Sequence, residues 1–366
     1  MYMLKLMRAP HKYVQGKGAL KEVYNETKDL GKRFLFICSN SGYKYCKSSI
    51  EAGFESKDVF LRFEVFGGIS SNGEIEKMRN IVKEDKIDVV VALGGGSAVD
   101  TAKATAYFEN KKVVIIPTVV ATDAPCTGLS VIYNNDGTFD KYIFYPSNPD
   151  TVIVDTQVIA NAPTKFLVAG MGDALGTYFE ARACQRVGAP SLENGGLTHS
   201  AMALCKICYD ILIENGAMAK EAVDNKLVTP AVEAVVEAAT YLSGVGADNG
   251  GLAAAHSIYN GFTGLEECEH TNHGDVVAFG TVVQLIMENA AKSEIEEVME
   301  FMYEVGLPLT LDKLGLTDKS RVIIACEKAC AEGETIHNMV GDVTPEILEN
   351  AILMADILGR KFINNK

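Results

Sequence analysis

The sequence predicts a doubly wound parallel α/β sheet in its N-terminal part and an all-helical C-terminal domain. Up to about residue 155, short apolar runs rich in β-branched residues alternate with helical patterns, which is the order of a parallel sheet covered by helices on both faces. After Asn161-Ala162-Pro163, nearly every segment has helical periodicity instead. We therefore expect a Rossmann-like α/β domain at residues 1–162 and a helical domain at residues 163–366.

Composition limits the classes of protein to which the chain can belong. Its 366 residues are enough for two cores, and 48% hydrophobic with 22% charged residues is typical of a globular protein. A formal net charge of −14 argues against a nucleic-acid or an anionic-membrane surface. No apolar stretch has the length of a membrane span, and residues 1–10 lack the apolar core of a signal peptide, so we expect a cytoplasmic protein.

The nine cysteines agree with a reducing compartment, because their number is odd and they are scattered. Cys205 and Cys208 form a C-x-x-C pair, but they lie in a helical pattern with no second pair. We interpret them as reduced helix cysteines; a redox or zinc-ribbon role is the alternative.

The individual elements follow from the periodicity of each segment. Apolar runs predict strands at residues 34–38, 59–66, 87–93, 113–116 and 152–155. Two further runs, 129–133 and 139–144, flank Asn134-Asn135-Asp136-Gly137 and predict a β-hairpin. The clearest helical patterns of the C-terminal part are at residues 166–186, 197–213, 230–242, 274–287 and 295–305.

Three glycines, Gly94 to Gly96, end the strand predicted at 87–93 and precede a helical pattern that begins at Ser97. They allow a sharp turn and close approach of a ligand, and the N-terminus of the helix favours a phosphate. The turn lacks the third glycine of a dinucleotide fingerprint, since Val99 stands there, and it is not a P-loop. The alternative is a purely structural turn in which Ser97 is the N-cap and Asp100 completes a capping box.

Polar segments follow several of the predicted strands. In a doubly wound sheet, ligands bind at the carboxyl ends of the strands. This rule brings Ser39 and Asn40, the turn at 94–97 and the segment 118–123 towards one crevice, although they are far apart in the sequence. Their convergence favours a phosphate-containing ligand more strongly than the glycine turn does alone.

Three residues of the helical part have the chemistry of metal ligands. Asp173 lies in an otherwise apolar helix, His256 ends an apolar run, and His273 precedes another apolar helix. One carboxylate and two imidazoles would leave coordination positions open for water or substrate. Their spacing matches no local zinc motif, so hydrogen-bonded helix histidines and an N-capping Asp are the alternatives.

The distribution of charge bears on the substrate class. No Lys or Arg lies between Lys226 and Lys292, whereas eight acidic residues do. Since phosphate and carboxylate substrates are usually held by basic side chains, a neutral alcohol or polyol fits better, unless Lys165 or Arg182 reaches the site.

Several motifs together resemble the glycerol dehydrogenase branch of the iron-containing alcohol dehydrogenase superfamily. They are Gly94-Gly95-Gly96-Ser97 with Asp100 and Lys103, Pro117-Thr118 followed by Thr122-Asp123-Ala124-Pro125, Gly172-Asp173-Ala174, Ala254-Ala255-His256, Tyr259-Asn260-Gly261, His273-Gly274 and Ala278-Phe279-Gly280-Thr281. The resemblance runs from about residue 10 to the C-terminus. It implies a dehydroquinate synthase-like architecture and reversible oxidation of glycerol, or a related small vicinal diol, to the hydroxyketone with NAD as hydride acceptor.

The resemblance also implies roles for individual residues. Asp173, His256 and His273 would hold one zinc ion per subunit, with Thr177 where relatives that use iron carry a further His. Asp123 would bind a substrate hydroxyl, and His270 is a candidate proton relay, with solvent as the alternative. A homo-octamer is implied as well. The residues implied at the NAD site are Ser39, Gly94, Gly95, Gly96, Ser97, Asp100, Thr118, Thr127, Leu129 and Tyr133.

Some positions depart from the family pattern. Ser39 and Asn40 stand where an Asp often holds the adenosine ribose, which leaves the choice between NAD and NADP open. Glu269-His270 replaces paired histidines, Tyr259 replaces another His, and Ala247 replaces a Phe.

Two alternatives to a polyol dehydrogenase remain. One is a dehydroquinate-synthase-like lyase, against which the lack of Lys and Arg counts, and the other is a non-enzymatic NAD-binding protein, against which the metal-ligand trio counts.

Overall fold

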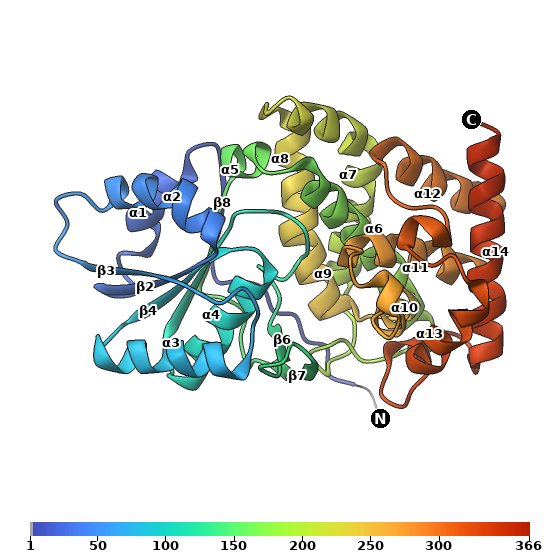
Figure 1. The fold of residues 1–366 in the computed structure, drawn as a ribbon, viewed down its shortest axis with the longest axis horizontal. Coiled ribbons are helices and arrows are strands. Elements are labelled where there is room, and N and C mark those ends of the chain that lie inside the picture. Colours follow the sequence, from blue (N-terminus) through green and yellow to red (C-terminus); the bar gives the residue numbers. More distant parts are fainter. Residues whose placement is uncertain (1–2) are drawn as a thin grey trace. The chain divides into compact units, whose positions relative to one another are not determined.

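The computed structural model describes residues 3–366, and the chain forms two compact units (Figure 1). The sheet unit comprises Arg8–Thr164 and Ala222–Tyr241. The helical unit comprises the residues up to Met7, Lys165–Glu221 and Leu242–Lys366. Each unit is discontinuous in the sequence, and the boundary at residues 162 and 163 stays a prediction for where separately folding domains divide.

The sheet unit is built on six parallel strands in the order β1-β8-β5-β4-β2-β3. Helices α1 (Val23–Thr27) and α2 (Asn40–Gly53) cover one face, and α3 (Asn72–Glu84) and α4 (Gly96–Phe108) cover the other (Figure 1). This arrangement confirms the predicted doubly wound parallel sheet. The strands are β1 (Tyr13–Gly16), β2 (Arg33–Cys38), β3 (Phe60–Val65), β4 (Val89–Gly94), β5 (Lys112–Pro117) and β8 (Thr151–Asp155).

The apolar runs form strands because the helices on both faces bury them. Every residue of β4 is buried. Its alternate residues Val89, Val91 and Leu93 join one core cluster with Phe34 and Phe36 of β2. Burial on both faces explains why the runs predicted at 34–38 and 87–93 are continuous rather than alternating.

Between β5 and β8, the chain forms a two-stranded antiparallel ribbon of β6 (Leu129–Tyr133) and β7 (Phe139–Phe144). It confirms the predicted hairpin. Ile132 of β6 packs with Ile75 of α3 and Ala104 of α4, so the ribbon extends the core on that face.

The edge strand β1 has no counterpart among the predicted strands. Its four residues include a Gln and a Gly and contain no apolar run. Pairing with β8 places it, and the Gln15 amide donates hydrogen bonds of 2.9 and 2.7 Å to the backbone and side chain of Glu233 in α8 (Pro230–Glu237). These contacts are tertiary, which is why local periodicity does not reveal the strand.

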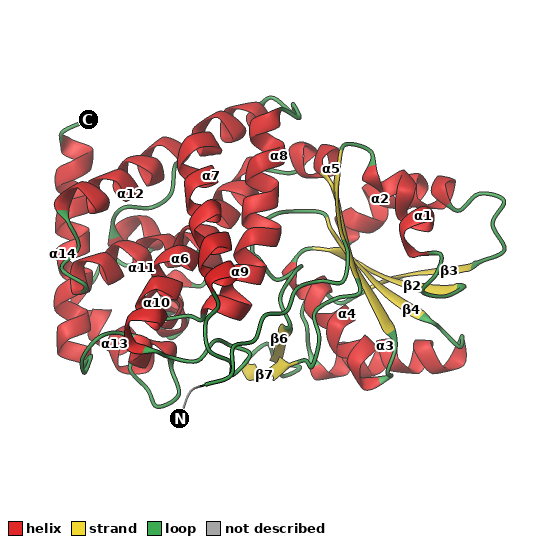
Figure 2. Cartoon of the chain, turned by 180° about the vertical axis from the view of Figure 1, so that it is seen from behind, coloured by secondary structure: helices red, strands yellow, loops and turns green. Residues whose placement is uncertain are grey.

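Residues 165–221 and 242–366 form helices and loops, and Gly196 in one of the loops makes an isolated β-bridge (Figure 2). The predicted all-helical part is thereby confirmed. Between residues 3 and 366, no helix combines the length and the apolarity needed to cross a membrane. Cys205 and Cys208 are both buried and are not joined in a disulfide. The remaining helices of the chain are α5 (Thr156–Asn161), α6 (Thr164–Val187), α7 (His199–Asp224), α9 (Ser243–Gly250), α10 (Ala254–Phe262), α11 (His273–Met287), α12 (Lys292–Val305), α13 (Val322–Ala329) and α14 (Pro345–Asn364).

Candidate functional site

The carboxyl ends of β2, β4 and β5 meet in the sheet unit, as the crevice rule predicts. The backbone N–H of Ser39 donates to the carbonyl of Leu93 at 3.0 Å, and that of Thr118 donates to the carbonyl of Gly94 at 3.0 Å. The Ser39 hydroxyl accepts from the N–H of Gly42 at 3.0 Å and caps α2, so the polar residues that follow β2 are the start of that helix. Segments far apart in the sequence therefore form one polar edge.

The capping-box alternative for the glycine turn is wrong. α4 begins at Gly96, its N-cap is Gly95, and no side chain caps it. Ser97 lies inside the first turn, and Asp100 is buried beneath β6, where the Ser130 hydroxyl donates to its carbonyl oxygen at 3.3 Å. The first N–H groups of α4 thus receive no side-chain cap from the described chain, which suits an anionic ligand.

The three glycines of the turn differ in what a side chain would meet. A Cβ at Gly94 would lie 2.7 Å from the Cβ of Ala98, so packing requires glycine there. A Cβ at Gly96 would meet only the hydroxyl oxygen of Thr122, at an ordinary 3.6 Å. Packing does not require the bare backbone at Gly96, and room for a ligand is the remaining physical reason for it. This observation fits a pyrophosphate.

A buried lysine shapes the loop between β5 and β6. The Lys103 ammonium, 3% exposed, donates to the carbonyl of Ala124 at 2.5 Å, the hydroxyl of Thr127 at 3.1 Å and the carbonyl of Leu129 at 2.9 Å. Two of the residues implied at the NAD site, Thr127 and Leu129, are therefore fixed by one cation. Asp123 stands in the same loop, where its carbonyl accepts from the N–H of Cys126 at 3.1 Å.

The ionisable groups beneath this loop are shifted by burial. Burial raises the pKa of Asp100 to about 6, although the Lys103 ammonium and Ser130 oppose the shift. Burial and the nearby Asp100 also raise the pKa of the Tyr133 hydroxyl.

The structure brings Asp173 of α6, His256 of α10 and His273 of α11 together in the helical unit. The Oδ1 of Asp173 lies 2.8 Å from Nε2 of His273 and 3.4 Å from Nε2 of His256. One ligand atom from each residue lies within 4.8 Å of the others, and the carboxylate is 1% exposed. A single cation can reach all three donors.

Glycines next to the ligands allow the helices to cross at short range. A Cβ at Gly274 would overlap the carbonyl oxygen of Ala169, and one at Gly172 would overlap the carbonyl oxygen of Gly274. α6 and α11 therefore touch backbone to backbone, which sets Asp173 beside His273. A Cβ at Gly280 would likewise lie 2.9 Å from the carbonyl oxygen of Ala255, so α11 also approaches α10 closely. This close crossing explains why a glycine precedes Asp173 and another follows His273 in the sequence.

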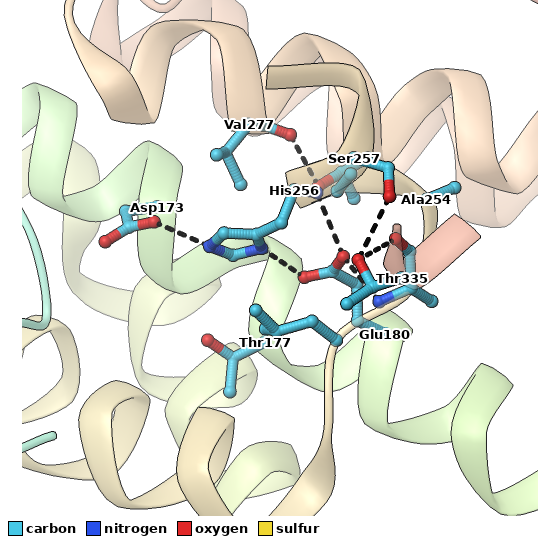
Figure 3. Close-up of polar contacts among 12 residues, drawn as sticks. Asp173, Thr177, Glu180, Ala254, His256, Ser257, Val277 and Thr335 are labelled. Atoms are coloured by element: carbon cyan, nitrogen blue, oxygen red, sulfur yellow. Dashed lines mark hydrogen bonds and ion pairs between the residues drawn. The ribbon is translucent and has the colours of Figure 1, made fainter. Parts of the chain in front are cut away.

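Glu180 is a neighbour of the trio that the sequence did not reveal. Its Oε2 lies 2.5 Å from Nδ1 of His256, so the imidazole sits between the carboxylates of Asp173 and Glu180 (Figure 3). Glu180 is completely buried and follows Asp173 by seven residues on α6. A buried carboxylate two helical turns from a ligand is the signal that would have found it.

The protonation of the trio reflects its mutual charges. Burial alone would raise the pKa of Asp173, but His273 and His256 lower it below its usual value. Burial alone would lower the pKa of His256, but the carboxylates of Glu180 and Asp173 raise it well above its usual value. The cluster therefore attracts positive charge, either as a proton or as a metal cation.

Thr177, Tyr259 and His270 differ in whether they contact the trio. Thr177 hydrogen-bonds Ser243 at 2.9 Å and takes no part in the ligand cluster (Figure 3). The ring of Tyr259 meets that of His273 edge-on, with centroids 4.1 Å apart. His270 lies exposed in the turn before α11, and its proposed relay role stays a prediction.

The donor set defines the chemistry of the site. Two imidazoles and one carboxylate match catalytic zinc, which keeps a fourth position open, and they also match the facial triad of ferrous iron. Either ion would supply a Lewis acid at a buried, polar position.

The chain is similar to known proteins over nearly its whole length. Residues 10–156 match the family described as iron-containing alcohol dehydrogenase. The chain is 44% identical to a glycerol dehydrogenase of Escherichia coli O6:H1 over 363 residues, 99% of each chain. It is 46% identical to one of Citrobacter freundii over 363 residues, 99% of this chain and 100% of the relative. A crystal structure of glycerol dehydrogenase from Schizosaccharomyces pombe superimposes with a TM-score of 0.95 at 33% identity, over 100% of this chain and 94% of that one.

Proposed function

The chain belongs to the glycerol dehydrogenase branch of the iron-containing alcohol dehydrogenase family, and from that premise we propose that it oxidises glycerol or a related small vicinal diol. The diol loses a hydride from its carbinol carbon and a proton from the hydroxyl on that carbon. The products are the hydroxyketone, the reduced nicotinamide cofactor and one proton, and the reverse reaction uses the same groups.

The buried trio of Asp173, His256 and His273 is the observation that carries this proposal. It offers one metal ion three donors within 4.8 Å of one another. The glycine turn of the sheet unit supports the second half of the reaction, because the uncapped start of α4 and the bare backbone at Gly96 suit a pyrophosphate. A metal centre and a dinucleotide seat are the two parts that an alcohol dehydrogenase of this family requires.

The residues of the chain divide the work of the reaction. Asp173, His256 and His273 would hold one zinc ion, and Asp123 would orient a neighbouring hydroxyl of the diol. When bound, the metal would supply Lewis acidity for the loss of the hydroxyl proton, and the nicotinamide would provide the hydride acceptor. Solvent or His270 carries the released proton away. The NAD site is formed by Ser39, Gly94, Gly95, Gly96, Ser97, Asp100, Thr118, Thr127, Leu129 and Tyr133.

We assign NAD as the cofactor, one zinc ion per subunit, a homo-octameric assembly and a cytoplasmic location. Thr177, which hydrogen-bonds Ser243, supports a three-ligand zinc site rather than one with a further His. The Ser39 hydroxyl caps α2. Unlike an Asp at this position, Ser39 has no carboxylate that would repel a 2′-phosphate, so NADP must be assayed beside NAD. Light scattering of the purified protein tests the assembly.

The substrate class is tested by NADH formation. Zinc-loaded protein is assayed at the NADH absorbance band with glycerol, 1,2-propanediol and butanediols, each with NAD and with NADP. Activity with at least one vicinal diol is expected. No activity with any diol would contradict the polyol assignment.

The metal assignment is tested by Asp173→Asn. The amide keeps the size of the side chain but removes the negative charge, so both bound zinc and diol-dependent NADH formation should be lost. Zinc content by elemental analysis is the direct measurement. Survival of both zinc and activity would show that Asp173 is not a ligand.

A further inference from the structure

The side chain of Glu180 makes its described hydrogen bonds to the start of α10. Its Oε2 lies 2.5 Å from Nδ1 of His256, and its Oε1 accepts from the backbone N–H of Ala253 at 2.8 Å and of His256 at 3.0 Å. The residue is 0% exposed. One buried carboxylate therefore holds both the backbone and the ring of the same histidine.

Gln284 of α11 completes the start of α10 without touching the ring. Its side-chain oxygen accepts from the N–H of Ala254 at 3.1 Å and of Ala255 at 3.4 Å, and its amide donates to the carbonyl of Phe179 at 3.0 Å. The helix has no side-chain cap from its own N-cap residue, Ala253. Glu180 and Gln284 thus share a structural task, but Glu180 alone also binds the imidazole.

The contact with the ring determines which nitrogen is available to a metal. A carboxylate accepts hydrogen bonds and cannot donate one, so Nδ1 of His256 must carry a proton. In the neutral ring, which is the form that binds a metal, the lone pair then belongs to Nε2, the nitrogen that lies 3.4 Å from Asp173. This is the orientation that a metal shared with Asp173 needs.

We propose that Glu180 is a positioning residue that presets His256 for metal binding, by fixing both the tautomer and the rotation of its ring. The inference rests on the proposed metal centre and adds a residue outside the ligand trio. Carboxylates that hold a ligating histidine in this way typically change metal affinity 10- to 100-fold when they are replaced.

Glu180→Gln is the decisive substitution because it replaces one carboxylate acceptor with an amide donor while keeping the size of the side chain. The amide oxygen can still accept from the N–H groups of Ala253 and His256, but the NH2 group then faces Nδ1. That arrangement shifts the ring proton to Nε2 and blocks the ligand. Zinc affinity of the metal-free protein, measured by competition with a chromophoric chelator, should fall roughly 10- to 100-fold.

Two further variants separate positioning from general structure. Gln284→Met removes the other bonds to the start of α10 but leaves the ring contact, so it should lower the melting temperature while zinc affinity falls by less than about tenfold. Glu180→Asp retains the carboxylate and should restore part of the affinity lost in Glu180→Gln. The absorption spectrum of bound cobalt, recorded on each variant, reports the ligand geometry independently of activity.

The outcomes distinguish this inference from the metal assignment itself. Wild-type protein that binds no zinc would contradict the metal centre. Wild-type affinity in Glu180→Gln, or an equal loss in Gln284→Met, would overturn the role of Glu180 alone. If the variants do not fold, a zinc-loaded crystal structure of the wild type decides: we expect zinc on Nε2 with Nδ1 still bonded to Glu180, whereas zinc on Nδ1 or on Glu180 would overturn the proposal.

Discussion

The glycine turn of the sheet unit and the glycine crossings of the helical unit look alike in the sequence but have different surroundings. At Gly96, a Cβ would meet only the Thr122 hydroxyl, at 3.6 Å. At Gly172 and Gly274, it would overlap the backbone of the neighbouring helix. In the first case the missing side chain leaves space, and in the second the space is already filled by protein.

The buried carboxylates of the two units show a second contrast. Burial raises the pKa of Asp100 to about 6 in the sheet unit, since the single Lys103 ammonium compensates it only in part. In the helical unit, the pKa of Asp173 is lowered despite burial because two histidines face it. The difference teaches that burial alone does not identify a cation site; the number of partners around the carboxylate does.

The largest effect is expected for Gly274→Ala. Because the new Cβ would overlap the carbonyl oxygen of Ala169, α6 and α11 must separate, at a cost of about 3 kcal/mol or more in unfolding free energy. Asp173 and His273 move apart with the helices, so zinc affinity should fall too. Urea unfolding and zinc competition measure the two effects. The matched control is Gly196→Ala, whose Cβ would come no closer than 3.5 Å to any neighbour, and it should be nearly neutral.

An intermediate effect is expected from the pH dependence of Asp100. Its folded pKa, about 6, exceeds the ordinary value of 3.8, so the stability it contributes is fully present below the lower value and is lost as pH rises through the higher one. Relative to Asp100→Asn, the wild type should lose about 2–3 kcal/mol between roughly pH 4 and pH 7. Lys103, Tyr133 and Tyr145 are titratable groups near Asp100, and burial raises the pKa of both tyrosines, which places their titration above this interval.

Urea unfolding of the wild type and of Asp100→Asn at several pH values is the measurement. A constant difference between the two proteins would mean that Asp100 is ionised to the same extent when folded and unfolded, and the contrast with Asp173 would disappear.

The smallest effect on the fold is expected for Gly96→Ala. The methyl group fits among the described residues, and alanine favours a helix, so the melting temperature should stay the same or rise slightly. The methyl group would occupy the space assigned to the pyrophosphate, so the affinity for NAD should fall about tenfold, or about 1.4 kcal/mol. Zinc content serves as the internal control. Unchanged NAD affinity would remove the distinction between the two kinds of glycine.

Local signals in the sequence account for most of the sheet unit. The run at 87–93 becomes β4 because helices cover both faces of the sheet, and the hairpin follows from Asn134 to Gly137 between two alternating segments. β1 escapes prediction because its place depends on β8 and on Glu233, which lies 218 residues after Gln15.

The metal centre is only partly visible in the sequence. The trio could be proposed from residue chemistry and from resemblance, since an isolated Asp and two histidines in apolar helices are unusual. Glu180 could not be paired with His256, because 76 residues separate them and only the packing of α6 against α10 joins them. The capping-box alternative failed because α4 begins before Ser97: its first residue is Gly96 and its N-cap is Gly95.

The discontinuity of the sheet unit sets an order of events during synthesis. The unit includes Ala222–Tyr241 as well as Arg8–Thr164, and α8 in the later segment supplies the Glu233 that holds β1 and also accepts from Thr156 at 2.7 Å. At roughly 5–20 residues per second, the ribosome needs several more seconds after Thr164 to deliver that segment. During this interval β1 lacks its α8 contacts and depends on its pairing with β8.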